Sequence, residues 1–177
     1  SSEDILREVK KLLDDSLDKL RRLIEKIKED LDRSVDRHRK LSEEIRRRHE
    51  RVREAVERRG SSEEKKERIE RNIREVEEEI KKVDEESKRI VDKLEKELRE
   101  VLRKSEETIK KIRKDIKDEG VDEDVARKLR ELVREHSKEV EDKVRRAARL
   151  VEEHTERSDR VADKLRKHIE ETKKRID

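Results

Sequence analysis

The stretch Gly60-Ser61-Ser62-Glu63-Glu64 interrupts a sequence that is otherwise helical in character, and it decides how the chain folds. Glycine is the usual residue just past a helix C-terminus, where the backbone becomes left-handed. A serine followed three residues later by a glutamate forms a capping box, which begins a new helix. This stretch therefore ends one helix and starts another.

A second interruption divides the rest of the chain into two parts of nearly equal length. Gly120 is the other of only two glycines, and the chain contains no proline. Asp122 follows Gly120 and can cap a helix through its carboxylate. The sequence therefore predicts three helices, over about residues 2–59, 62–118 and 122–176.

Apolar residues recur about every 3.6 positions within each segment, which is the period of a helix with one buried face. In the last segment this stripe begins with Val125, Leu129 and Leu132. Short loops place consecutive helices antiparallel, and a lone helix of this composition has nothing to bury its face against. We expect an all-α fold: a single-chain, antiparallel, up-down-up three-helix bundle, coiled-coil-like, with long and nearly straight helices and residues 1–177 in one domain.

Composition agrees with long helices and argues against several classes of function. Charged residues make up 60% of the chain and hydrophobic residues 27%, with no aromatic residue. This mixture is typical of coiled coils, in which two positions in seven are apolar. The lack of cysteine rules out disulfides and thiol chemistry. The net charge of +3 is too small to indicate a nucleic-acid or membrane partner, and no apolar run has membrane-spanning length.

Polar side chains interrupt the apolar stripe, and they coincide in layers when the chain is folded at its glycines. Folding at Gly60 brings residue i beside about residue 120 − i, and folding at Gly120 brings residue j beside about residue 240 − j. The polar residues then form four layers, which we expect to be buried: Ser16, Ser105 and His136; Ser34, Ser87 and His154; His38 and Ser158; and His49, Asn72 and His168.

These layers indicate buried hydrogen-bond networks that specify the register of the helices. Histidine, serine and asparagine each offer donors and acceptors, whereas an unpaired buried polar group costs about 1–3 kcal/mol. A pH switch is a second interpretation, since buried neutral histidines lose stability in acid. Metal binding is a poor fit, because Asn72 is a weak third ligand beside His49 and His168. Catalysis is a poor fit as well, since Ser34 and His154 have no orienting carboxylate.

The chain resembles computationally (de novo) designed helical bundles with buried hydrogen-bond networks. The features that carry this resemblance are the Ser/Ser/His and His/Asn/His layers, the loop at residues 60–64, and a surface saturated with lysine, glutamate and arginine. The resemblance covers the whole chain. It implies a stable folded bundle, with pH-sensitive or modular assembly in some members, and it implies no catalytic residues.

We therefore expect a designed structural scaffold that is not an enzyme, has no natural biochemical activity, and uses no cofactor, metal ion or small-molecule substrate. The alternative is a pH-responsive or partner-binding module, a component of a designed helical oligomer that is switched by protonation of buried histidines. The scaffold requires no partner, whereas the module would self-associate or bind a designed helical partner. Such a protein has no natural location and is soluble, expressed recombinantly in the cytoplasm.

Overall fold

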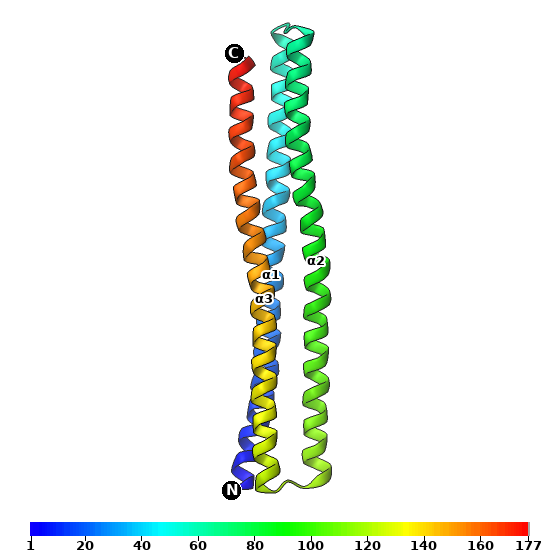
Figure 1. Ribbon diagram of the computed structural model, residues 1–177, viewed down its shortest axis with the longest axis vertical. Coiled ribbons are helices and arrows are strands. Elements are labelled where there is room, and N and C mark those ends of the chain that lie inside the picture. Colours follow the sequence, from blue (N-terminus) through cyan, green and yellow to red (C-terminus); the bar gives the residue numbers. More distant parts are fainter. Residues whose placement is uncertain (177) are drawn as a thin grey trace. The chain divides into compact units, whose positions relative to one another are not determined.

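The computed structural model describes residues 1–176, so Asp177, the last residue of the expected domain, lies outside the described part. The chain forms three α-helices, α1 (Ser2–Arg58), α2 (Glu63–Glu119) and α3 (Glu123–Ile176) (Figure 1). Each observed helix end lies within one residue of the expected one. Residues 1–176 contain no strand. The prediction of an all-α fold with three helices that pack against one another is confirmed.

The glycine after α1 ends this helix with a pair of backbone hydrogen bonds. Gly60 has a φ angle of 60°, and its N–H donates to the carbonyl oxygen of Glu57 at 3.2 Å. The N–H of Ser61 donates to the carbonyl oxygen of Val56 at 3.4 Å. This is the Schellman arrangement. A left-handed backbone costs a residue with a Cβ atom about 1–2 kcal/mol, which explains why glycine stands here.

Side chains cap the starts of the following helices, although one cap differs from the expected one. Asp122 accepts a hydrogen bond from the N–H of Val125 at 2.9 Å, as the sequence predicted. At the start of α2, Ser62 accepts from the N–H of Lys65 at 3.3 Å. The expected capping box at Ser61 is wrong, because Ser61 belongs to the turn that closes α1. No box forms at Ser62 either, since a lysine ammonium cannot accept a hydrogen bond in return.

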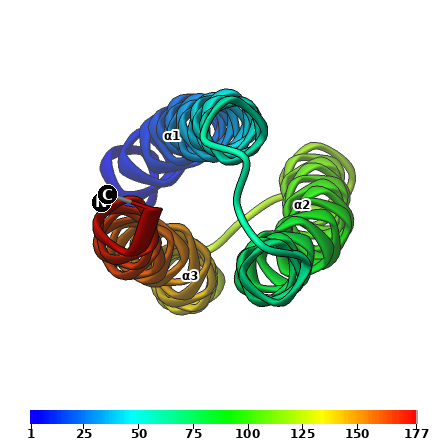
Figure 2. The ribbon, with the colours of Figure 1, turned by 90° about the horizontal axis from the view of Figure 1, so that it is seen from above.

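Long-range contacts divide the chain into two compact units. Of the described residues, the first unit contains 1–30 and 92–150, and the second contains 31–91 and 151–176. Every helix contributes one segment to each unit. Figure 2 shows the three helices from above, with the loops 59–62 and 120–122 that connect them. The polar clusters described below each belong to one unit.

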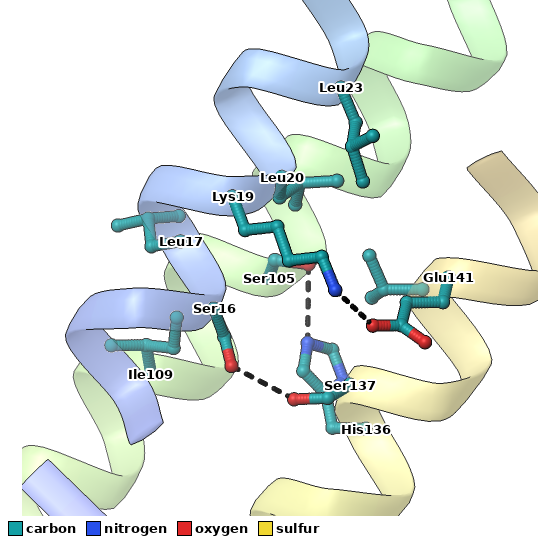
Figure 3. Close-up of a pocket in the computed structure, with 11 residues that line it drawn as sticks. Ser16, Leu17, Lys19, Leu20, Leu23, Ser105, Ile109, His136, Ser137 and Glu141 are labelled. Carbon is teal, nitrogen blue, oxygen red and sulfur yellow. Dashed lines mark hydrogen bonds and ion pairs between the residues drawn. The ribbon is translucent and has the colours of Figure 1, made fainter. Parts of the chain in front are cut away.

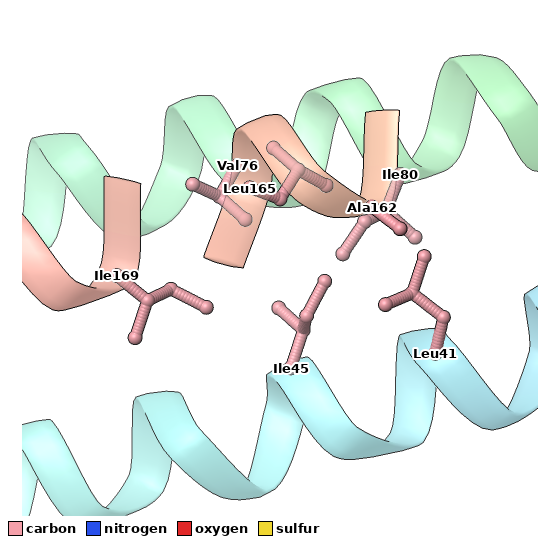
Figure 4. Packing of buried hydrophobic residues seen from close by; sticks show 7 residues of the cluster. All are labelled: Leu41, Ile45, Val76, Ile80, Ala162, Leu165 and Ile169. Atoms are coloured by element: carbon pink, nitrogen blue, oxygen red, sulfur yellow. The ribbon is translucent and has the colours of Figure 1, made fainter. Parts of the chain in front are cut away.

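The core of each unit consists of aliphatic side chains from all three helices. A cluster of the first unit contains Val9, Leu13, Ile109, Ile112 and Val133. One cluster of the second unit contains Leu41, Ile45, Val76, Ile80, Ala162, Leu165 and Ile169 (Figure 4). Another contains Val52, Val56, Ile69, Ile73 and Ile176. Burial of these apolar faces supplies the driving force for helices that are too polar to persist alone.

Contacts between helices follow a consistent order within each unit. In the second unit, residue numbers rise together between α1 and α3 in the pairs Ser34–His154 and Glu44–Arg166. They run in opposite orders between α1 and α2 in the pairs His38–Asp84 and Arg53–Glu70. The first unit follows the same two orders in the pairs Glu8–Arg130, Lys19–Glu141, Asp14–Arg113 and Arg21–Glu106.

The buried face of α3 begins one residue away from the expected stripe. Val125 is 39% exposed and Leu132 is 49% exposed, whereas Ala126 and Val133 are buried. The expectation that Val125 and Leu132 are core residues is therefore wrong. Each has an apolar neighbour that lies about 100° further round the helix. Because both residues of each pair are apolar, periodicity does not choose between them, and packing against the other two helices does.

Candidate functional site: buried polar clusters

The most complete polar cluster surrounds His154 in the second unit. This side chain comes from α3 and meets Ser34 of α1 and Ser87 of α2, and all three residues are buried. Nδ1 of His154 lies 2.9 Å from Ser34 Oγ, and Nε2 lies 2.7 Å from Ser87 Oγ. Thr155 donates its hydroxyl proton to Ser34 Oγ at 2.8 Å. The hydrogen bonds of this cluster therefore join all three helices of the unit.

The direction of the hydrogen bond between Ser87 and His154 follows from the number of protons available. Ser87 donates its single hydroxyl proton to the carbonyl oxygen of Val83 at 2.9 Å, so it can only accept from Nε2–H of His154. The Thr155 hydroxyl lies 2.8 Å from Ser34 Oγ and also 3.0 Å from the carbonyl oxygen of Val151, so its single proton is shared between the two. In the neutral ring with its proton on Nε2, Nδ1 accepts from Ser34, and both ring nitrogens have a partner.

A second cluster of the same unit surrounds His38 and includes a carboxylate. Nε2 of His38 lies 2.7 Å from Asp84 Oδ1, and Nδ1 lies 3.4 Å from Ser158 Oγ. Ser42 donates to the backbone carbonyl oxygen of His38 at 3.1 Å. The expected neighbours His38 and Ser158 are buried and in contact, whereas the Asp84 side chain is 43% exposed. A carboxylate, an imidazole and a hydroxyl from three helices therefore form one chain.

In the first unit, the expected layer of Ser16, Ser105 and His136 forms two separate hydrogen bonds. Only Ser105 is buried as expected, whereas Ser16 and His136 are half-buried. Nε2 of His136 lies 3.2 Å from Ser105 Oγ. Ser16 Oγ instead lies 3.0 Å from the hydroxyl of Ser137, so it joins the layer through the neighbour of His136 (Figure 3). These groups border a pocket of about 40 Å³. Small-molecule sites measure roughly 300–1,000 Å³, so this pocket has room only for a molecule the size of water.

The expected layer of His49, Asn72 and His168 is not joined by hydrogen bonds in the described part of the chain. His49 is 2% exposed, yet its Nδ1 atom has no hydrogen-bond partner among residues 1–176. Glu77 Oε1 lies 3.8 Å from this atom. Asn72 and His168 are only half-buried. Ile169 occupies the core position expected for His168. The buried face is therefore shifted by one residue here, as it is at the start of α3.

Burial lowers the pKa of three histidines, His49, His136 and His154, from the ordinary value of 6.5. For each ring, loss of solvent around the charged imidazolium is the largest cause. Nearby carboxylates oppose the lowering of the pKa, Glu77 at His49 and Glu86 at His154. Burial therefore favours the neutral imidazole at these three positions.

Four residues of these clusters lie outside the stripe that the sequence predicts, namely Ser42, Asp84, Ser137 and Thr155. Each directly follows a residue of that stripe: Leu41, Val83, His136 and His154. The next residue on a helix lies about 100° further round, at the edge of the buried face. The available signal was a short polar side chain at a position where this chain usually carries a long lysine, arginine or glutamate.

Neither a metal-ligand cluster nor a membrane-spanning segment occurs in the described residues. Within residues 1–176, no group of three or more His, Cys, Asp or Glu side chains is placed to hold a metal ion. None of the helices in this range is long and apolar enough to cross a membrane. Comparisons with models of protein families, with curated protein sequences and with solved structures found no match.

Proposed function

We propose that this chain is a structural scaffold: a single antiparallel, up-down-up bundle of three long, coiled-coil-like helices, of the kind designed with buried hydrogen-bond networks. It has no natural biochemical activity and no natural location, requires no cofactor, substrate or partner, and is expressed recombinantly in soluble form. Its buried serine and histidine side chains specify the order and register of the helices. The observation that carries this proposal is the fully paired cluster around His154.

The aliphatic core by itself is a weak determinant of register. Its positions are filled by leucine, isoleucine, valine and alanine, and these side chains make similar contacts when one helix slides past another. Directional hydrogen bonds are different, because a small shift removes them completely. A polar core position therefore distinguishes one register from its neighbours more sharply than an apolar one does.

The His154 cluster supports this role because a shift of α2 would break it. Moving α2 by one turn, about 5.4 Å, would place Val83 or Val91 where Ser87 now meets Nε2–H of the ring. A buried donor without a partner costs about 1–3 kcal/mol. The network thus acts mainly by penalising wrong registers, and its net contribution to the stability of the correct one is modest.

The test compares a variant in which the His154 network has lost one partner with a variant in which apolar side chains replace the network. We expect S87A to lose about 1–3 kcal/mol of unfolding free energy in denaturant, because Nε2–H of His154 is left unpaired. The triple variant S34A/S87A/H154L should recover most of that loss, since no buried polar group remains. It should also populate more than one register, visible as several sets of backbone amide resonances. S61A, in the loop between α1 and α2, is the matched control and should resemble the parent protein.

A single set of resonances in the triple variant would overturn the proposal, because the specificity would then come from the aliphatic core. The number of resonance sets does not depend on the size of the stability change. It therefore distinguishes a network that specifies structure from one that only adds stability.

One observation favours the alternative of a pH-responsive, partner-binding module. Nδ1 of His49 is buried without a hydrogen-bond partner, 3.8 Å from Glu77. An imidazole with an unpaired buried nitrogen does not contribute its full stability at neutral pH. Protonation of Nδ1 would allow His49 to pair with the Glu77 carboxylate. Sedimentation at about pH 8 and about pH 5 distinguishes the two functions. A change in oligomeric state between these values supports the module, and an unchanged state supports the scaffold.

A further inference from the structure

We propose that Ser158 is a nucleophile that activated esters acylate, with His38 as its base and Asp84 as the residue that positions His38. The three side chains come from α3, α1 and α2 of the second unit and form one hydrogen-bonded chain. This reactivity goes beyond the scaffold role and does not depend on it.

Asp84 determines which nitrogen of His38 carries the proton. Its carboxylate can only accept, so the contact of 2.7 Å with Nε2 requires a proton on Nε2. Nδ1 of the neutral ring then presents a lone pair. Ser158 Oγ lies 3.4 Å from Nδ1 and has no other hydrogen-bond partner in the described structure, so its hydroxyl proton is directed to the ring. The combination of a hydroxyl, a base and a group that orients the base is the requirement for an activated serine.

The distance of 3.4 Å between Ser158 Oγ and Nδ1 is longer than a strong hydrogen bond. Such contacts are often loose in proteins without a bound substrate and shorten in the reacting complex. The ring itself is held on both sides, by Asp84 at Nε2 and by the surrounding core, since His38 is buried. A small rotation of the Ser158 side chain is sufficient to shorten the contact.

Ser158 borders a surface pocket of the second unit, which gives a reagent a route towards it. The residue is only 6% exposed, but it lines a pocket of about 340 Å³ together with Leu41 and Ala162. This volume lies at the lower end of the range for small-molecule sites, roughly 300–1,000 Å³. Leu41 and Ala162 supply an apolar contact for a short acyl chain.

Charged side chains of both signs surround the same pocket. Its lining includes the cations Arg37, Lys40 and Arg166 and the carboxylates Glu44, Asp159 and Asp163. Each cation is already paired, Arg37 with Asp159 at 3.1 Å, Arg166 with Glu44 at 3.2 Å and Lys40 with Asp36 at 3.1 Å. Backbone N–H donors are occupied inside a helix, so there is no preorganised oxyanion hole of the kind that contributes about 10²–10³ in rate. We therefore expect slow acylation and a persistent acyl group, without rapid turnover.

The reaction balances without any further reactant. Ser158 Oγ forms a bond to the carbonyl carbon of the ester as the hydroxyl proton moves to Nδ1 of His38. The tetrahedral intermediate then expels the leaving group, which is p-nitrophenolate when the ester is p-nitrophenyl acetate. His38 afterwards releases its proton to water. Asp84 accepts the Nε2–H hydrogen bond throughout and remains a carboxylate.

Three other buried serines that contact a histidine ring offer matched controls. Ser34 and Ser87 bond to His154, whose ring nitrogens both bond to hydroxyls and not to a carboxylate. Ser105 bonds to His136 in the same way. A serine beside a histidine is thus common to several clusters. Of these serines, Ser158 is the one whose histidine contacts a carboxylate and which also borders the pocket of about 340 Å³.

The experiment treats the intact protein with p-nitrophenyl acetate and locates the acetyl group by mass spectrometry of peptides. We expect one acetyl group on Ser158, lost in S158A and retained in S34A. D84N should lower the rate of Ser158 acetylation roughly tenfold or more, because the charge and the tautomer of the base are no longer supported. D84E should recover part of that rate, which a purely structural role of Asp84 would not explain.

Acetylation confined to lysines or to the N-terminus would overturn the proposal, as would an equal rate at Ser158 in D84N and the parent. Circular dichroism of each variant checks that it is folded. The half-exposed position of Asp84 makes D84N and D84E a test that holds even if S158A fails to fold.

Discussion

The hydroxyl of Ser87 and Nε2 of His154 lie 2.7 Å apart, and the proton between them belongs to the histidine. This follows because the hydroxyl proton of Ser87 is already donated to the carbonyl oxygen of Val83, one turn earlier on α2. A backbone carbonyl of α2 therefore determines the tautomer of a side chain on α3. With the ring neutral and its proton on Nε2, Nδ1 accepts, and the hydroxyl proton of Ser34 lies on that side of the ring.

The first prediction concerns this tautomer. Long-range ¹H–¹⁵N spectra at neutral pH should show His154 as the Nε2–H form, with an Nε2 proton that exchanges slowly with water. The physical reason is that the Ser87 hydroxyl donates to the carbonyl oxygen of Val83, so its oxygen is left as the acceptor for Nε2–H. In S87A the Nε2 proton loses its acceptor and should exchange faster. An Nδ1–H form in the parent protein would contradict the direction that we assign to the network.

The second prediction concerns acid stability. Since burial lowers the folded-state pKa of His49, His136 and His154, the unfolded chain binds more protons than the folded chain below about pH 6.5. Stability should therefore be complete above this value and decline as the pH falls through it. Guanidinium unfolding at a series of pH values, followed by circular dichroism, measures the decline. A midpoint that is the same at about pH 8 and about pH 5 would show that these rings take up protons at no cost.

The third prediction concerns the unpaired nitrogen of His49. H49L should raise the unfolding free energy by about 1–3 kcal/mol at neutral pH, because it removes a buried acceptor or donor that has no partner. It should also reduce the loss of stability in acid, since one titrating ring is gone. H154L is the informative comparison, because it removes a ring whose two nitrogens are paired and should not be stabilising. A destabilised H49L would indicate that the ring packs better than its unpaired nitrogen suggests.

The fourth prediction concerns the buried face at the start of α3 and its surroundings. L132A should change stability by less than about 0.5 kcal/mol, because Leu132 is half-exposed. L13A should cost about 2–5 kcal/mol, since Leu13 belongs to the core cluster of the first unit. The two substitutions remove the same atoms, so denaturant unfolding isolates the effect of burial. Similar losses in both variants would mean that Leu132, and not Val133, faces the core.

Much of the secondary structure could be predicted from local chemistry. The helix ends follow from Gly60 and Gly120, since their φ angles of 60° and 59° suit glycine and few other residues. The cap of α3 follows from Asp122, whose carboxylate lies close to the N–H of Val125 whatever the rest of the chain does. These features depend on residues within one turn of each other, so the sequence contains all the information that they require.

The polar clusters were only partly predictable. Ser34, Ser87 and His154 could be placed in one layer because folding at two glycines aligns them in height, and height depends on residue number alone. Counting residues does not show how each helix is rotated about its own axis. Asp84 and Thr155 belong to the clusters but lie at the edge of the buried face. At such a position, the sequence does not distinguish a polar residue that bonds inward from one that faces solvent.

The sequence by itself determined three helices, their ends and the heights of their polar residues, because each of these depends on local backbone preferences and on counting along the chain. Only the tertiary structure decided which of two adjacent apolar or polar residues faces the core. Ile169 is buried where His168 was expected, and Ala126 where Val125 was. The physical reason is that neighbours on a helix differ by about 100° in direction, and close packing against two other helices selects between them.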